Sequence, residues 1–429
     1  MKNRWNLYAA DNFYPFLLVL AVAVVYSTAI TNDFVLLWDD RWQVMADMTS
    51  AGFTPANLQA IFTESLCGQY SPVNQLCYLV VYTLAGGYHA SAFHLFCVAV
   101  HLANTGLIYI LFVRLLSGST RMKEEWIKPV AFITAVLFAV HPLNVEAVAW
   151  ISASKIVVYA FFYLLALYTY VIYVESRKTG YLLLSLFFFL CSFGGKEQAV
   201  ILPVCLFVID WLMKRDWRDK RVWLEKLPFL FLACMMGCLT FYFAYGQVSL
   251  GGRNYALWQR LVFGSYSFTE YLSKWLIPIN LLYVYPFPSQ LGEPVPYRFL
   301  FYPLLLTVIV LSFRKILAKW YVAFGLLFFT VNLVMTLHII PMPRFTIVAD
   351  RYIYLSSAGL SFIAGYLLCT IYFRYKAIGK YAVLLFALCC LGLSFYARQR
   401  VKVWKNSDTL KYEIRELLEE RNDFLYPDL

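Results

Sequence analysis

The chain has 429 residues, of which 61% are hydrophobic and only 14% are charged, and its formal net charge is +11. Soluble domains are about half apolar and about a quarter charged, so this composition excludes a soluble globular protein. The basic excess predicts positively charged cytoplasmic loops and no nucleic-acid partner, because no basic stripe accompanies a recognition helix. The sequence therefore predicts a polytopic protein embedded in the lipid bilayer.

Apolar runs predict an all-α membrane protein with about 11 transmembrane helices. A span needs about 20 apolar residues, or somewhat fewer where neighbours bury it. The predicted spans are 13–31, 92–116, 129–148, 156–175, 181–193, 198–213, 227–246, 298–313, 319–338, 352–373 and 380–397. The segment 259–281 contains Arg260, Glu270 and Lys274, so we expect it to be interfacial or re-entrant, with its polar face against protein.

The distribution of Lys and Arg predicts the orientation in the membrane. With a cytoplasmic N-terminus and a non-crossing 259–281, more than half of the basic residues lie in cytoplasmic loops. This assigns a transmembrane domain to 1–397, including a large first outer loop at 32–91. It also assigns a short non-cytoplasmic helical tail to 398–429. We expect the first apolar run to be a retained helix, because no small-residue cleavage site follows it.

Ten cysteines are present, and eight of them lie in apolar runs, where they act as small hydrophobic residues. Cys67 and Cys77 lie near the first outer loop, where either a disulfide or two free thiols is consistent with the sequence, and free thiols are favoured. No Cys/His cluster indicates a zinc site.

Two adjacent carboxylates, Asp39 and Asp40, follow the first span directly. They are consistent with a solvated helix end. They are also consistent with a general base at the membrane interface, because partial burial and a neighbouring like charge raise a carboxyl pKa toward a useful value.

A polar insertion, 141–155, separates two apolar spans. Pro142 suits the first turn of a short helix, in which Glu146 and Trp150 share a face. We expect His141 to make a hydrogen bond at the start of that helix rather than to bind a metal. Ionisable groups at membrane depth are functional candidates.

A second insertion, Gly194-Gly195-Lys196-Glu197, lies between two short spans. The glycine pair allows tight backbone passage, and the amides that follow can face an anion. The segment is too short for a P-loop and lacks the preceding strand. A plain outer turn with a Lys–Glu pair is an equally good interpretation.

Several cations lie on the predicted outer side against the orientation rule. Arg351 begins a span there, and Lys155, Lys196, Arg253 and Arg344 are similar exceptions. Their arrangement predicts an anion at membrane level, such as a lipid phosphate.

These motifs resemble, in order, the membrane part of the transmembrane O-mannosyltransferases that carry tetratricopeptide repeats. The resemblance covers nearly the whole chain and rests on Trp38-Asp39-Asp40, Gln69-Tyr70-Ser71-Pro72-Val73-Asn74, Phe93-His94 with Asn104, His141-Pro142 with Glu146-Ala147-Val148, Lys196-Glu197, Asp350-Arg351 with Tyr354-Leu355-Ser356-Ser357, and 403–410.

The resemblance implies a glycosyltransferase of the C-type membrane fold. Such an enzyme takes a sugar from a polyprenyl-phosphate donor on the non-cytoplasmic side and transfers it to an acceptor hydroxyl. The family-based acceptor is a protein Ser/Thr hydroxyl, with a glycan or lipid hydroxyl as the alternative, and the sugar is a hexose such as mannose. The family's repeat array is missing, so acceptor capture by repeats is not implied. The short form suggests a bacterial inner membrane, a periplasm-facing site and an undecaprenyl lipid.

We assign roles to these residues from the expected chemistry. Asp40, or else Asp39, is the expected general base for one displacement with inversion. The cations stabilise the phosphate leaving group, and the remaining polar residues orient the sugar or acceptor. The expected phosphate ligands are Arg351, Lys196, Lys155, Arg253 and Arg344, and the expected orienting residues are Glu146, Glu197, His141 and Tyr70. The many carboxylates leave room for a divalent metal, although no ligand spacing demands one.

Two other classes of function compete with this interpretation. A transporter or flippase of lipid-linked sugars would need broken helices in matching halves and charge near the midplane, whereas the charges here concentrate in outer loops without repeat symmetry. An inactive interaction scaffold would tolerate loss of the Asp pair.

Overall fold

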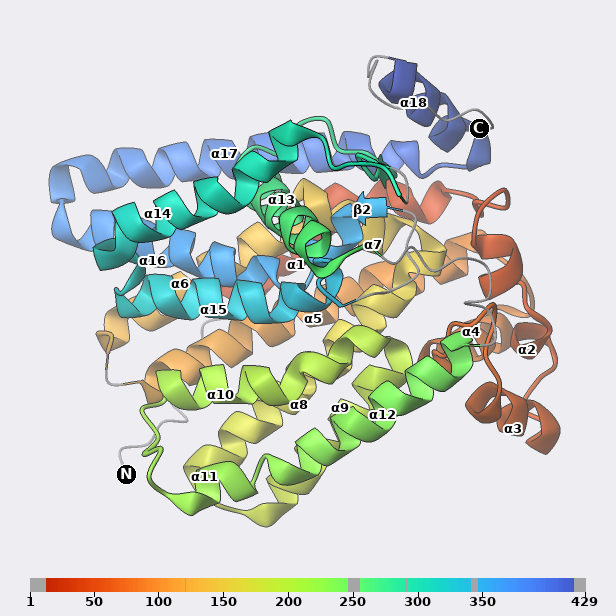
Figure 1. The fold of residues 1–429 in the computed structure, drawn as a ribbon, viewed down its shortest axis with the longest axis horizontal. Coiled ribbons are helices and arrows are strands. Elements are labelled where there is room, and N and C mark those ends of the chain that lie inside the picture. The colour runs from red at the N-terminus through yellow and green to blue at the C-terminus, as the bar shows by residue number, and fades with distance from the viewer. Residues whose placement is uncertain (1–12, 120, 246–254, 290–291, 341–345, 420–429) are drawn as a thin grey trace.

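The computed structural model describes residues 13–119, 121–245, 255–289, 292–340 and 346–419 (Figure 1). Helices dominate it. Their bounds are α1 Phe13–Tyr26, α2 Asp47–Ser50, α3 Pro55–Thr63, α4 Pro72–Ala85, α5 Ala90–Gly118, α6 Glu124–Val140, α7 Val145–Ala149, α8 Ser154–Ser176, α9 Thr179–Gly195, α10 Leu202–Leu212, α11 Lys220–Leu224, α12 Leu227–Tyr245, α13 Leu257–Leu276, α14 Phe301–Leu317, α15 Trp320–Leu333, α16 Ser357–Arg374, α17 Lys376–Val403 and α18 Ser407–Glu419.

The strands form one short antiparallel ladder between β1 (Tyr285–Pro286) and β2 (Thr346–Val348). In Figure 1 the long helices run side by side, with α2–α4, β2 and α18 toward one end of the bundle and α11 toward the other. The short elements that follow α1 and α17 therefore share one end of the molecule.

Seven described helices are long and apolar enough to cross a membrane, and a bent pair raises the number to eight. Two shorter apolar helices, Thr179–Gly195 and Trp320–Thr336, accompany them. The outer helices present apolar surface: α14 has no buried residue, and side chains such as Leu304 and Leu385 are exposed. The structure is an all-α polytopic membrane protein, but the predicted count of 11 spans is not confirmed. The amphipathic α13 is not among the seven.

The predicted continuous span 129–148 is wrong in detail. The chain bends by 57° between Glu124–Val140 and Pro142–Ala149. Pro142 explains the break, because proline removes an amide donor and disfavours helical backbone in the residue before it. His141 accordingly has extended backbone, with φ −69° and ψ 128°. The bend places α7 across the end of the bundle.

The loop after α1 folds into the short helices α2, α3 and α4. Pro55 and Pro72 start α3 and α4, and the Thr54 hydroxyl caps α3 by accepting from the Asn57 amide (3.2 Å). Pro at the first position suits a helix start because its missing N–H would be unpaired there anyway. Cys67 and Cys77 in this region are free thiols.

This loop is bonded to the end of α17. The Asp33 amide donates to the Lys405 carbonyl (2.8 Å), and the Asn32 side chain donates to the Val401 carbonyl (3.1 Å). Because α17 continues to Val403, the predicted domain limit at 397 lies inside a helix. The first loop and the tail therefore share one end of the bundle, and so one predicted side of the membrane.

A reporter fusion tests which side this is. With the cytoplasmic N-terminus predicted from the basic residues, a C-terminal reporter that is active only in the cytoplasm should stay silent. The same reporter fused after Lys214, in the predicted cytoplasmic loop at the other end of the bundle, is the matched control and should be active. An active C-terminal fusion would contradict the predicted orientation.

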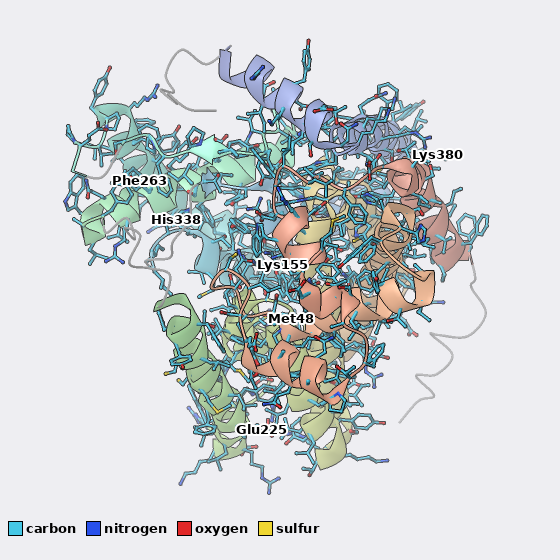
Figure 2. The ribbon with its side chains drawn as sticks, turned by 90° about the vertical axis from the view of Figure 1, so that its right-hand side faces the viewer. Met48, Lys155, Glu225, Phe263, His338 and Lys380 are labelled. Carbon is cyan, nitrogen blue, oxygen red and sulfur yellow. The ribbon has the colours of Figure 1, made fainter. Side chains whose placement is uncertain are left out.

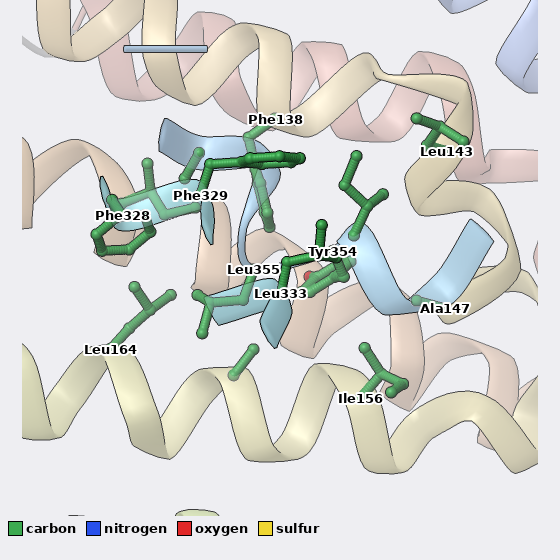
Figure 3. Close-up of a cluster of buried hydrophobic side chains, with 14 of the residues drawn as sticks. Phe138, Leu143, Ala147, Ile156, Leu164, Phe328, Phe329, Leu333, Tyr354 and Leu355 are labelled. Atoms are coloured by element: carbon green, nitrogen blue, oxygen red, sulfur yellow. The ribbon is translucent and has the colours of Figure 1, made fainter. Parts of the chain in front are cut away.

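The interior below α7 is packed with apolar and aromatic side chains. Figure 3 shows Phe138 from α6, Leu164 from α8 and Phe328 from α15 in one cluster with Tyr354 and Leu355. The edge of the Tyr354 ring packs against Phe138 at 4.8 Å between centroids. This core fixes the ends of α6 and α8 and the segment after β2, from which the polar residues of the next section project.

Candidate functional site

Three cations from distant parts of the chain come together at the end of the bundle that carries α2–α4. Lys155 lies at the start of α8, Lys196 follows α9, and Arg351 lies in the turn Asp350–Ile353. Lys196 and Arg351 both lie close enough to Lys155 for their like charges to act on it. Lys155 and Lys196 are each 7% exposed. Figure 2 looks onto this end and labels Lys155 near its centre.

Lys155 is held by neutral amide oxygens. Its Nζ donates to Gln69 Oε1 (2.5 Å), and the Gln43 amide, turned to satisfy its neighbours, accepts from the same Nζ at 2.8 Å. Amide oxygens orient an ammonium group without neutralising it. Lys155 therefore remains available to an anion.

Lys196 depends on the glycine pair that precedes it. A Cβ at Gly195 would lie 2.9 Å from the Tyr159 amide nitrogen, so only glycine allows α9 this close to α8. Lys196 forms a 3.5 Å ion pair with Glu197, whose side chain is 28% exposed. The close backbone approach expected from the glycine pair and the Lys–Glu ion pair of the alternative interpretation thus occur together.

Arg351 is fixed by Glu146. The Glu146 carboxylate accepts from both the Arg351 amide (2.8 Å) and its Nη1. Trp150, one turn further along, lies under the guanidinium at 5.4 Å, so both members of the predicted helix face contact Arg351. Burial would lower the pKa of Arg351, but Glu146 holds it well above its usual value.

Asp40 is fully buried, and both of its carboxylate oxygens accept hydrogen bonds from other parts of the protein. One oxygen accepts from the Ser152 amide (3.0 Å) and hydroxyl (2.5 Å), and the other accepts from the Val35 amide (2.7 Å). Burial raises the pKa of the Asp40 carboxyl to about 6, although these hydrogen bonds oppose the shift. Asp40 ties the first loop to the segment that starts α8.

Asp39 has the opposite environment. Its side chain is partly exposed, and it accepts one hydrogen bond, from Trp42 Nε1 at 3.3 Å. Asp39 also interacts electrostatically with Lys155 and with Tyr283. Of the two adjacent carboxylates, Asp39 therefore faces the cations while Asp40 anchors the loop.

The raised pKa of Asp40 predicts a pH-dependent stability. The pKa is higher in the folded chain than the usual 3.8, so the folded state binds the proton more tightly. We expect the unfolding temperature of the wild type, relative to Asp40→Asn, to fall between about pH 4 and about pH 6 and then to level off. A difference that does not change with pH in this range would contradict the assignment.

Tyr283 is a site residue that the sequence analysis missed. The centroid of its ring lies 5.2 Å from that of Trp38, which precedes Asp39. It lies 5.4 Å from that of Trp150, the ring under Arg351. Burial raises the pKa of its hydroxyl well above the usual value; Arg351 opposes this shift, and Asp39 adds to it. No charged motif marks the segment around Tyr283, so the sequence gave no signal beyond its aromatic residues.

Other predicted site residues have different partners. His141 Nδ1 accepts from the Leu143 amide (3.3 Å) at the start of a short helix, and its ring stacks on Trp275. The Tyr70 hydroxyl donates to the Phe62 carbonyl (2.9 Å), and its ring stacks on Phe243. Arg253 and Arg344 lie outside the described residues.

The described side chains of the site do not form an evident set of metal ligands. Within the described ranges, no three His, Cys, Asp or Glu side chains are grouped as metal ligands would be. Divalent ions such as Mg²⁺ bind carboxylate oxygens, and two of the carboxylates at the site, Glu146 and Glu197, are already paired with Arg351 and Lys196.

Parts of the chain are similar to curated protein O-mannosyl-transferases. Over 210 residues the chain is 28% identical to protein O-mannosyl-transferase TMTC4 of Homo sapiens, covering 44% of this chain and 28% of that protein. Over 185 residues it is 29% identical to protein O-mannosyl-transferase Tmtc1 of Drosophila melanogaster, covering 41% and 20% respectively. Each match spans less than a third of the relative's length. No protein-family model matches the chain.

The fold is similar to that of a solved oligosaccharyltransferase from Archaeoglobus fulgidus. The structure with a tethered acceptor peptide aligns with a TM-score of 0.50 and 12% identity, covering 97% of this chain and 59% of that one. The apo form aligns with a TM-score of 0.50 and 13% identity, covering 98% and 62%. The expected C-type membrane glycosyltransferase fold is thereby confirmed.

Proposed function

We propose that this protein is a membrane glycosyltransferase that moves a sugar from a polyprenyl-phosphate donor to an acceptor hydroxyl. The observation that carries the proposal is the meeting of Lys155, Lys196 and Arg351 at one end of the bundle, with Asp39 facing them. Four buried or half-buried charges from four distant segments are costly to assemble in a membrane protein, and such groups mark functional sites.

The three cations suit the leaving group of this reaction. When the bond between the sugar and the polyprenyl phosphate breaks, the phosphate gains one negative charge. Preorganised cations stabilise that charge as it develops, so the leaving group needs no general acid. Arg351 is the most rigid of the three because Glu146 fixes both its backbone and its guanidinium. We therefore assign Glu146 as the positioning residue of Arg351.

Asp39 is the proposed general base. An acceptor hydroxyl has a high pKa and must lose its proton as it attacks the anomeric carbon, on the face opposite the leaving phosphate. Asp39 has a carboxylate oxygen with access to the site, whereas both Asp40 oxygens are already bonded. One displacement of this kind inverts the anomeric configuration, as it does in other direct displacements at sugars.

Trp38 and Tyr283, between base and cations, supply the surface for the sugar, and the buried Trp150 ring supports them from its place against Arg351 and Trp404. Trp38, Tyr283 and Trp150 follow one another with ring centroids 5.2 and 5.4 Å apart. Such rings offer apolar faces to a sugar ring and a polar edge to its hydroxyls. Glu197, half-exposed beside Lys196, is placed to accept a hydrogen bond from a sugar hydroxyl.

We infer the classes of the sugar donor and the acceptor from the similar proteins. The names of these O-mannosyl-transferases support mannose as the sugar and a protein hydroxyl as the acceptor. A glycan or lipid hydroxyl would use the same base and the same cations. We place the site on the non-cytoplasmic face, which is the periplasmic face in a bacterial inner membrane.

Transfer by the purified protein tests the proposal. The full chain in detergent is incubated with radiolabelled mannosyl phosphoryl polyprenol and Ser/Thr-rich peptides, glycans or lipid alcohols. We expect label to move to one acceptor class, with stoichiometric polyprenyl phosphate. Movement of intact donor across proteoliposomes without any transfer would instead favour a flippase, and the absence of both would favour a scaffold.

A further inference from the structure

A hollow lies among α1, α5 and α8, away from the residues assigned above. Its volume is about 640 Å³, and its lining includes Leu18 of α1, Leu102 and Gly106 of α5, and Phe161 of α8. This volume lies within the range of about 300–1,000 Å³ that is typical of ligand sites. The rest of the lining is aliphatic or aromatic, and Lys128 of α6 is its one charged residue. We refer to this hollow as the α1–α5–α8 groove.

Small residues of α5 create the groove. Ala103 and Gly106 lie one turn apart on its wall, and a Cβ added at Gly106 would meet no atom within 4 Å. Glycine in a helix interior costs about 1 kcal/mol relative to alanine. The space is therefore open to a ligand rather than closed by the packing of α1 against α8.

Lys128 brings a charge to the mouth of the groove. No ion pair or hydrogen bond joins it to any residue in the described part of the chain, although Glu124 lies one helical turn away. The adjacent Lys123, in contrast, pairs with Glu125 at 3.8 Å and is 75% exposed. Lys128 thus offers its ammonium to a group in the groove's mouth.

The groove opens at the end of the bundle opposite the candidate site. Lys128 lies near the start of α6, and the site segment follows Val140 at its other end. Twelve residues of helix separate them, a rise of about 18 Å. The wall residue Phe161 is also six residues further along α8 than Lys155, a rise of about 9 Å. Lys128 and the candidate site therefore lie toward opposite leaflets.

We propose that the α1–α5–α8 groove binds one hydrocarbon chain of an anionic phospholipid from the leaflet opposite the candidate site, with the lipid phosphate at Lys128. An apolar groove ending in a cation that has no ion-pair partner among the described residues is complementary to a chain ending in a phosphate. Juxtamembrane cations of this kind attract anionic lipids. The inference does not depend on the proposed transfer reaction.

Lipid-dependent thermal stability of the full chain tests the charge. The purified, delipidated protein is titrated with phosphatidylglycerol or phosphatidylcholine in mixed micelles. Phosphatidylglycerol should stabilise it at lower concentration, and Lys128→Gln should weaken that effect about fivefold. Lys123→Gln removes the same charge outside the groove and should behave as wild type. Equal stabilisation by the two lipids, or equal losses in the two variants, would overturn the proposal.

Filling the groove tests the chain-binding part. Gly106→Leu should abolish the stabilisation by phosphatidylglycerol, whereas Gly237→Leu, at a position on α12 that is equally open, should not. Should Gly106→Leu fail to fold, cross-linking of a photoactivatable phosphatidylglycerol to wild-type α5 replaces it. Cross-links elsewhere would overturn the proposal. Competition by polyprenyl phosphate would also overturn it, because the groove would then belong to the donor. A protein that transfers no sugar but still binds phosphatidylglycerol in the groove would contradict the proposed function and support the groove.

Discussion

Asp39→Asn should lower the turnover of sugar transfer by roughly two to four orders of magnitude while the protein still binds its donor lipid. The substitution keeps the shape of the side chain and removes the proton acceptor. Because Asp39 is partly exposed and accepts only one hydrogen bond, from Trp42, the unfolding temperature should change little. Turnover at saturating donor, measured beside donor affinity, checks this result.

The adjacent Asp40→Asn is the matched control. An amide there turns an NH₂ group toward the Val35 or Ser152 donors, so one buried donor loses its acceptor. The cost is about 1–3 kcal/mol of stability. Turnover of the folded fraction should fall less than in Asp39→Asn. Near-normal turnover in Asp39→Asn, with a large loss in folded Asp40→Asn, would make Asp40 the base.

Arg351→Gln should give the second large effect, a loss of both donor binding and turnover of at least about a hundredfold. The substitution also leaves the buried Glu146 carboxylate without its cation, which costs about 3–5 kcal/mol when one partner of a buried pair is removed. A single variant therefore mixes chemistry with folding.

The double variant Glu146→Gln/Arg351→Gln separates the two effects. It removes both charges, so stability should recover while donor binding stays lost. Lys196→Gln should show a weaker donor defect with less loss of stability, because its partner Glu197 is half-exposed. Recovery of turnover together with stability in the double variant would show that Arg351 serves folding and not the phosphate.

Sequence patterns located the long apolar helices and three of the five predicted phosphate ligands, but not the number of spans or the break at His141. Apolar runs locate the long helices because lipid demands continuous apolar surface and internally bonded backbone. Three cations, Lys155, Lys196 and Arg351, lie at helix ends against the orientation rule. Their positions predicted a shared anion site, and the structure brings the three together.

The roles of neighbouring residues could not be read in this way. Asp39 and Asp40 are chemically identical in the sequence, and only the fold buries one against Ser152. Glu146 was expected to orient the sugar, but its partner Arg351 lies 205 positions away. Tyr283 was missed because a single tyrosine among many aromatic residues carries no positional signal. Such assignments depend on long-range packing.

The configuration of the new glycosidic bond distinguishes a single displacement at the sugar from the alternative mechanisms. In the proposed mechanism, Asp39 and the three cations lie on opposite faces of the reacting carbon, so one displacement inverts that carbon. Magnetic resonance of the product from a donor of known anomeric configuration should show the opposite anomer, formed at a rate that depends on Asp39. Product with retained configuration would contradict the account, because it requires a covalent intermediate or attack from the other face.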